Sequence, residues 1–422
     1  MGPKQYTSRL AAATLVLAAA LPAAAGDGCP PGVRDAAAAV ARLHGAGRLE
    51  VRCETVPARE LAARLKHQLE ASLPVPLETE LEIAWRLGLT GGRRPDEVEG
   101  PLLDLLASQV LGYYDPVRDT VVLVAGQQGT AGIPGLDALI WSHEVEHAYQ
   151  EHRYRLGTRL FSLRGDTDAQ LAASAVAEGD AVLVMAALAV ASENPSPAEL
   201  ADASEAILDA LGTLGGGLPG TGVPGPFVEQ LLFPYREGTR FVAGALREGG
   251  WEAVETLLAD PPASTEQLLH ADRRHDAPTP LTAAELPTAA GWEPVVTDTT
   301  GEWGLVQWLG VALPAGRARR AAAGWDGDRT RVSRSRDGTL WRVDILSVWD
   351  TEADASEAAS AFREALPALL VLGEGPPDVT VLRDGTRVTV TAAGTAAELP
   401  RKGGSTVPSS PGGARPTPPA GR

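Results

Sequence analysis

The chain has 422 residues and carries 37 lysines and arginines against 54 aspartates and glutamates, a formal charge of −17. At roughly 150 residues per domain, this length predicts two folded units. The surplus of acid repels nucleic acid and anionic lipid surfaces, so no nucleic-acid partner is expected.

The first 25 residues have the features of a secretory signal peptide. Lys4 and Arg9 give a cationic start, an apolar run follows over residues 10–21, and alanines at positions 23–25 provide a cleavage site. The apolar run is shorter than the ~20 residues that cross a bilayer, and no membrane span is predicted later in the chain. We therefore expect an exported protein, either secreted or periplasmic.

Cys29 and Cys53 are the only cysteines of the sequence. In an oxidising compartment the two thiols can form one disulfide, and two unrelated thiols are the alternative. Lipid attachment at Cys29 is not expected, because residues 26–28 (Gly-Asp-Gly) lack the apolar residue of a lipoprotein signal.

The first folded unit is predicted to be mainly helical. Residues 34–111 have helical apolar spacing with proline and glycine breaks and one β-prone piece at 49–54. Residues 112–116 (Gly-Tyr-Tyr-Asp-Pro) predict a turn, and residues 120–124 (Thr-Val-Val-Leu-Val) predict a strand. A small sheet within a helical domain is the expected result.

A metal-binding motif lies in the helix predicted over residues 136–155, where positions 143–147 read His-Glu-Val-Glu-His. His143 and His147 are four residues apart, so both imidazoles project to one side of a helix and can coordinate one zinc ion. Glu144 would face the open coordination position and take a proton from the attacking water. Such a pattern also arises by chance, but the strand before it and the export signal favour the functional interpretation.

A third ligand must come from elsewhere, and Glu178 is the candidate. It lies in a helix predicted over residues 168–191, on a face that is otherwise almost entirely apolar, where a carboxylate is costly unless it is paired or binds metal. The alternative is a buried acid satisfied by hydrogen bonds or an arginine. His152 is one residue short of the spacing of three-histidine sites and is expected at the surface or in a supporting role. Asp180 is expected to hold a nearby backbone group or a ligand histidine.

The order of these segments resembles the gluzincin branch of the zincin-like metallopeptidases. More narrowly, residues 112–116, a strand, the motif at 143–147 and residues 178–181 (Glu-Gly-Asp-Ala) are similar to a set of little-characterised secreted bacterial proteins with peptidase-like domains. The resemblance covers about residues 50–275. One departure is Val182, which stands where several gluzincins have an aspartate.

The resemblance implies a zinc-dependent peptide hydrolase that acts on a peptide or protein substrate. It implies that His143, His147 and Glu178 bind zinc and that Glu144 is the general base. It also implies that the strand at 120–124 is an edge strand along which an extended peptide pairs.

A donor for the developing oxyanion is expected downstream of the ligands. Tyr235 is the better candidate, because it precedes Gly238 and Phe241 in a pattern that resembles the segment of related peptidases. His270 is a second candidate. The alternative for Tyr235 is an ordinary tyrosine at the start of a helix.

The second unit is predicted to be a small α+β domain. Asp-Gly turn signals at 337–338 and 384–385 are flanked by β-prone residues, and residues 352–370 have a helical pattern. Alternate residues of one strand would share a face: Trp341, Val343, Ile345 and Trp349. The tryptophans of this unit are expected in its core and not on a sugar-binding surface.

The predicted fold class is therefore α+β, with a mainly helical zincin-like domain that contains a small mixed sheet and a small α+β accessory domain. The predicted segments are a signal peptide at 1–25, the metallopeptidase domain at 26–287, the accessory domain at 288–398 and a disordered Pro/Gly-rich tail at 399–422. The predicted function is that of a secreted zinc metallopeptidase. A catalytically inactive binding or scaffold protein with the same fold is the alternative, and no oligomeric state is predicted.

Overall fold

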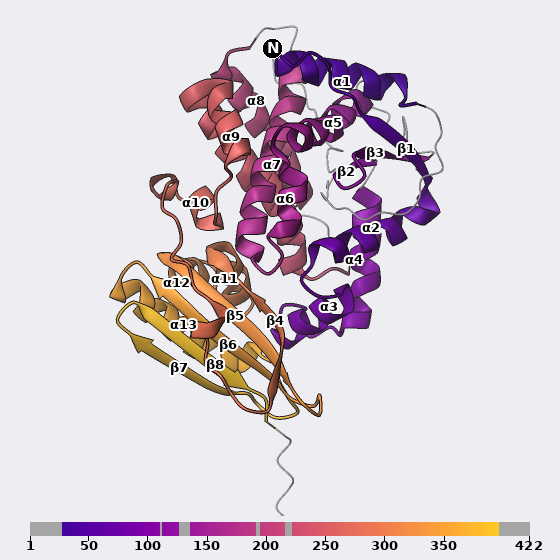
Figure 1. Ribbon diagram of the computed structural model, residues 1–422. Coiled ribbons are helices and arrows are strands. Elements are labelled where there is room, and N and C mark those ends of the chain that lie inside the picture. Colours follow the sequence, from indigo (N-terminus) through magenta and orange to yellow (C-terminus); the bar gives the residue numbers. More distant parts are fainter. Residues whose placement is uncertain (1–27, 110–111, 126–135, 191–194, 216–221, 396–422) are drawn as a thin grey trace, which may run out of the picture.

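The computed structural model describes residues 28–109, 112–125, 136–190, 195–215 and 222–395. The predicted signal peptide and tail lie outside the described residues. The fold is α+β, mostly helical with a small mixed three-strand sheet and a C-terminal five-strand antiparallel sheet (Figure 1). The predicted fold class is confirmed.

The elements before residue 290 form the helical part of the molecule. They are α1 (Pro31–Leu43), β1 (Arg52–Pro57), α2 (Ala58–Ser72), α3 (Leu77–Arg86), α4 (Pro95–Gln109), β2 (Gly112–Asp115), β3 (Thr120–Ala125), α5 (Leu136–Tyr154), α6 (Leu156–Ser162), α7 (Thr167–Ala189), α8 (Pro197–Gly215), α9 (Gly225–Ala259), α10 (Thr265–Leu269) and the short 3₁₀ turns Ala271–Arg273 and Ala283–Glu285.

Helix α7 is the central helix of this part and packs against α5, α8 and α9 (Figure 1). Asp166 caps its start by accepting a hydrogen bond from the Ala169 backbone. Nearly every side chain from Asp168 to Ala187 is buried, because the helix is apolar on all sides. Among the described residues it is the one helix whose length and composition would allow a membrane span, and 83% of that stretch is buried inside the protein, as in a core helix.

The small sheet has the strand order β1-β3-β2, in which β1 is parallel and β2 antiparallel to β3. The predicted strand at 120–124 is present as β3, but it is the central strand, so the expectation of a peptide-binding edge there is wrong. Its second neighbour comes from β1, some 70 residues earlier, and a strand's own sequence does not reveal how many partners it has. The turn predicted at 112–116 is wrong for residues 112–115, which form strand β2, and the turn itself lies at 116–119.

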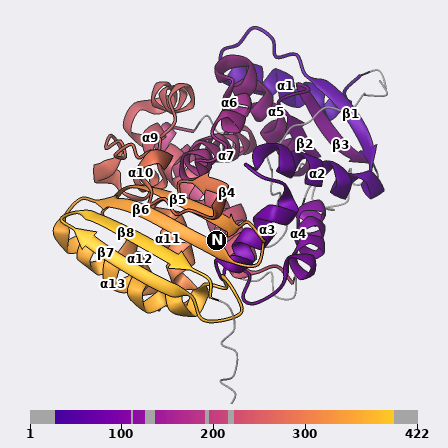
Figure 2. The same ribbon diagram turned by 60° about the horizontal axis from the view of Figure 1, so that its bottom comes forward.

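The C-terminal part is a five-strand antiparallel sheet of order β4-β5-β6-β8-β7, with α11, α12 and α13 packed on one face (Figure 2). Both predicted Asp-Gly turns connect adjacent strands, and the predicted alternate face of β6 lies in the core. The elements are β4 (Trp292–Asp298), α11 (Gly301–Gly310), α12 (Ala315–Ala322), β5 (Trp325–Ser335), β6 (Trp341–Trp349), α13 (Glu352–Leu369), β7 (Asp378–Asp384) and β8 (Arg387–Ala393).

The two parts are joined by direct contacts. Ile83 of α3 belongs to the same hydrophobic core as the C-terminal sheet. The indole of Trp308 donates a hydrogen bond of 2.8 Å to the carbonyl of Leu87, and the hydroxyl of Thr167 donates one of 2.5 Å to Asp298. The second bond holds the first residue of α7 against the end of β4.

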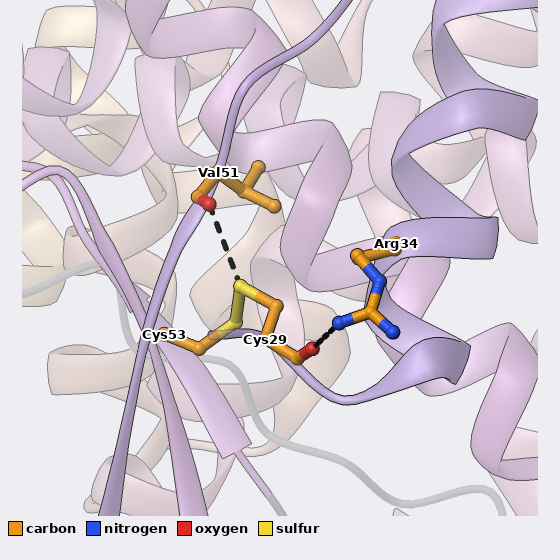
Figure 3. Close-up of a disulfide and its surroundings, with 4 residues drawn as sticks. All are labelled: Cys29, Arg34, Val51 and Cys53. Atoms are coloured by element: carbon orange, nitrogen blue, oxygen red, sulfur yellow. Dashed lines mark hydrogen bonds between the residues drawn. A yellow bond between two sulfur atoms is a disulfide. The ribbon is translucent and has the colours of Figure 1, made fainter. Parts of the chain in front are cut away.

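Cys29 and Cys53 form a disulfide that joins the start of α1 to β1 (Figure 3). The Arg34 side chain donates a hydrogen bond to the carbonyl of Cys29, and the Cys29 sulfur lies 3.4 Å from the carbonyl oxygen of Val51. Because α1 packs along α5, the bridge anchors the helix that covers the motif helix.

Candidate metal centre

Three side chains from two helices converge on one point. His143 and His147 lie one turn apart on α5, and α7 crosses this helix with Glu178 facing them. The two histidine Nε2 atoms are 3.2 Å apart, and Glu178 Oε2 lies 3.1 Å from His143 Nε2 and 3.6 Å from His147 Nε2. Each residue is at most 3% exposed.

This triangle has the dimensions of a metal site. Zinc bonds of about 2.0–2.2 Å at tetrahedral angles place two ligand atoms about 3.3 Å apart. Two imidazoles and one carboxylate also form a common donor set of catalytic zinc. The second oxygen of Glu178 is buried and has no hydrogen-bond partner in the described part of the chain, so it too can turn to a cation. The residues present therefore fit a bound metal ion.

The charges at this point favour a bound cation. Burial opposes ionisation of Glu178, yet the two neighbouring histidines outweigh it and lower the pKa of the carboxyl. Burial likewise disfavours a protonated His147, but the facing carboxylate raises its pKa to about 9. The buried Glu178 carboxylate thus stabilises a positive charge on His147, and a divalent ion bound at this point can replace the proton that gives His147 that charge.

Glu144 is completely buried beside the triad. Its Oε2 accepts a hydrogen bond of 3.1 Å from the backbone nitrogen of Tyr114 in β2. This bond ties the Glu144 carboxylate to strand β2, and its charge acts on His147.

Gln150 sets the orientation of His147. Its side-chain oxygen lies 2.9 Å from Nδ1 of His147, and its nitrogen donates to the carbonyl of Ala177 and to Asp180 Oδ2 at 3.0 and 2.8 Å. Because the amide oxygen can only accept, Nδ1 of His147 carries the proton and Nε2 keeps its lone pair for a metal. Asp180 therefore acts on the ligand histidine through Gln150.

A second buried polar group includes Glu146, the residue before His147 on α5. His44, at the end of α1, lies 2.9 Å from Glu146 through its Nε2 atom and stacks on Tyr149. Burial lowers the pKa of His44, raises that of Glu146 to about 8 and raises that of Asp180 well above its usual value. With a pKa near 8, Glu146 retains a proton at neutral pH, which lowers the cost of burying it.

Tyr235 of α9 lies next to the triad. Its ring is nearly parallel to that of His143, with the centroids 6.4 Å apart, and it is 7% exposed. Tyr235 and Glu178 line the same cavity of about 410 Å³ between the helical part and the C-terminal part. The Tyr235 ring is thus placed where a ligand in this cavity would also meet Glu178.

The other predicted candidates lie elsewhere. His152 is at the surface and pairs with Asp119 at 2.7 Å. His270 pairs with Glu302 of α11 at 2.9 Å, across the junction of the two parts. Neither is among the side chains that meet at the triad.

Sequence reasoning missed the partners that support the site. His44 and Glu146 are 102 residues apart, and only packing of α1 on α5 brings them together. Gln150 offered a weak signal, because it lies three residues after His147 and so on the same face of the helix. The cavity had no sequence signal, since its walls come from two separate parts of the chain.

Comparison with known proteins gives one match. A model of a domain of unknown function (DUF8575) matches residues 285–402. This stretch overlaps the predicted accessory domain at 288–398. No curated protein and no solved structure matches the chain.

Proposed function

We propose that the protein is a secreted zinc-dependent metallopeptidase. The observation that carries the proposal is the buried triangle of His143, His147 and Glu178 with Glu144 beside it. The Cys29–Cys53 bridge supports export, because disulfides persist in oxidising compartments.

The chain's own residues divide the work of peptide hydrolysis. A zinc ion at the triad would polarise the attacking water and the scissile carbonyl. Glu144 takes the proton of that water and passes it to the leaving amine. Tyr235 donates a hydrogen bond from its hydroxyl to the oxyanion that develops on the carbonyl. Gln150 keeps His147 in the tautomer that binds metal.

Metal content tests the first part of the proposal. Wild-type protein should contain one zinc per chain, and His143→Ala should lose it. His152→Ala is the matched control on the same helix, because that histidine pairs with Asp119 at the surface. An absence of metal from the wild type, or equal metal in the two variants, contradicts the site.

Proteolysis tests the second part. A peptide-library digest should show cleavage by the wild type and a loss of at least 100-fold in Glu144→Gln, with zinc content unchanged in that variant. Equal cleavage by the two proteins excludes the mechanism. Zinc binding without any cleavage identifies the alternative, a binding or scaffold protein that retains the fold.

A further inference from the structure

The cavity next to the triad has walls from both parts of the chain. The helical part contributes α2, α3, α4, α7 and α9, and the C-terminal part contributes β4, β5 and α11. Along α11, Trp303, Gly304, Gln307 and Trp308 line the cavity, a spacing that places them on one face of the helix. One face of the domain of unknown function is thus turned toward Glu178 and Tyr235.

The lining is mostly apolar, and its charged members are acids. Leucines of α2, α3 and α4 form much of the helical wall, and Val296 and Val332 extend the apolar surface on the other side. The charged side chains that line the cavity in the described part of the chain are Glu80, Asp168, Glu178 and Asp298, and none of the lining residues is Lys, Arg or His. Away from the metal ligands, a carboxylate or phosphate entering this cavity would lose its water without meeting a basic side chain, which is costly.

Direct contacts hold the wall from the C-terminal part in a fixed position relative to the helices that carry Glu178 and Tyr235. Thr167, the first residue of α7, donates two hydrogen bonds to Asp298 of β4, from its backbone nitrogen at 2.8 Å and its hydroxyl at 2.5 Å. The same helix carries Glu178 three turns later. Phe233 of α9 packs against Trp303 of α11 with ring centroids 4.8 Å apart, which ties Tyr235's helix to the same wall.

We propose that the C-terminal domain forms one wall of the substrate cleft, and that this wall selects internal peptide segments with uncharged aliphatic side chains. This inference rests on the proposed peptidase function and deepens it. Apolar side chains gain free energy by leaving water for the leucine-rich walls. Away from the metal, acidic side chains and a free C-terminal carboxylate would lose their water against walls without a basic side chain, so the cleft favours segments internal to the chain.

Three quenched fluorescent peptides test the selectivity. The first peptide is blocked at both ends and has leucines on either side of a fixed core. The second has glutamates in place of the leucines. The third is the leucine peptide shortened so that it ends in a free carboxylate next to the core. The wild type should have a kcat/KM at least 100-fold higher for the first peptide than for the other two. Ratios below 10-fold overturn the inference.

Gln307→Arg tests whether the C-terminal wall contacts the substrate. An arginine there supplies the missing counter-charge, so the preference for leucine over glutamate should fall by at least 10-fold while zinc content stays the same. Gln230→Arg is a second variant on the opposite wall; position 230 is exposed, so the fold tolerates the change. Leu382→Arg on β7 is the control, because this exposed side chain lies outside the cavity. If both variants fold and keep the wild-type ratio of kcat/KM for the leucine and glutamate peptides, the C-terminal part does not form a wall of the substrate cleft.

Binding separates this inference from the proposed function. If the wild type cleaves none of the peptides, fluorescence anisotropy still measures how tightly the cleft of the Glu144→Gln protein binds the blocked peptides. The Glu144→Gln protein should bind the leucine peptide more tightly than the glutamate peptide, and this ratio of affinities should fall when Gln307→Arg is added. That result would support the role of the C-terminal wall even if the proposed peptidase activity is wrong. Equal binding of the leucine and glutamate peptides overturns the inference.

Discussion

Gly179 of α7 and Gly238 of α9 face each other where the two helices cross. A Cβ atom on Gly179 would overlap the backbone of Gly238, and one on Gly238 would overlap the carbonyl of Ala175. The two helices therefore approach as closely as their backbones allow. This crossing places Tyr235, one turn before Gly238, beside the residues around Glu178.

Gly238→Ala should separate the two helices. The added methyl group cannot be accommodated without a backbone shift, so we expect the free energy of unfolding to fall by about 2–3 kcal/mol and the kcat for peptide cleavage to fall with it. Urea unfolding measures the first effect. Gly244→Ala is the control on the same helix, since its Cβ would lie 3.6 Å from the nearest side chain, and it should be neutral or stabilise by up to about 1 kcal/mol. Equal stabilities of the two variants would show that the crossing is not tight.

Gln150→Ala should weaken metal binding without removing a ligand. His147 then loses the acceptor that fixes its tautomer, and changes of this kind reduce metal affinity about 10- to 100-fold. Competition with a chelator of known affinity gives the measurement. Gln170→Ala on α7 is the control: it removes a hydrogen bond that the side-chain amide donates to the carbonyl of Leu160, and it should leave the metal affinity unchanged. A Gln150→Ala protein with wild-type affinity would show that the amide does not position His147.

Tyr235→Phe should lower kcat about 100-fold with little change in KM. The hydroxyl acts on a charge that develops only in the transition state, so its removal affects turnover and not ground-state binding. Steady-state kinetics on the blocked leucine peptide make the distinction. His270→Ala should leave kcat unchanged because this residue pairs with Glu302. The reverse pattern would assign the oxyanion donor to His270.

Loss of the disulfide should destabilise the helical part. The bridge closes a segment of 24 residues, for which the chain-entropy estimate is about 3 kcal/mol. Replacement of both cysteines by serine should lower the free energy of unfolding by that order, as measured by urea titration. Reductant should destabilise the wild type to the same extent and have no further effect on the double variant. If reductant leaves the free energy of unfolding of the wild type unchanged, the disulfide does not contribute to its stability.

The stability of the protein should fall as pH rises through neutrality, in part because of Glu266. This side chain of α10 is 2% exposed, and burial, with Glu302 and Asp350 nearby, raises its pKa from 4.5 to about 8. Between these values the folded state holds a proton that the unfolded state has lost. The free energy of unfolding therefore decreases with pH, by at most about 1.4 kcal/mol per pH unit from this group.

Glu266→Gln should remove this contribution. Its stability relative to the wild type should rise from pH 5.5 to pH 7.5 in urea titrations, because the neutral amide has no proton to lose. Glu293→Gln, at an exposed position of β4, is the control and should follow the wild type at both pH values. If the free energies of unfolding of Glu266→Gln and the wild type change in parallel with pH, Glu266 does not hold a proton in the folded state at neutral pH.

The sequence predicted the elements that depend on neighbouring residues. The helix at 136–155 matches α5 to within a residue, and both Asp-Gly hairpins are present. A period of 3.6 or 2 is set by residues a few positions apart, so it can be read without knowledge of the fold. Glu178 could be singled out in the same way, because a lone carboxylate on an apolar helix requires a partner.

Relations between distant residues could not be read in this way. Strand β3 was expected at an edge, but β1 pairs with it and makes it central. The contact of His44 with Glu146 likewise joins helices that no local pattern connects. Each depends on how whole elements pack, and many packings are compatible with the same local pattern.

The sequence by itself determined that two histidines share a helix face with an acid beside them, because their spacing equals one helical turn. The tertiary structure decided that Glu178 completes the triangle, that Gln150 orients His147, and that the C-terminal domain closes the cavity beside them. The first set of relations follows from covalent spacing along one helix. The second follows from the burial of α7 among its neighbours and from the contacts that hold the two parts of the chain together.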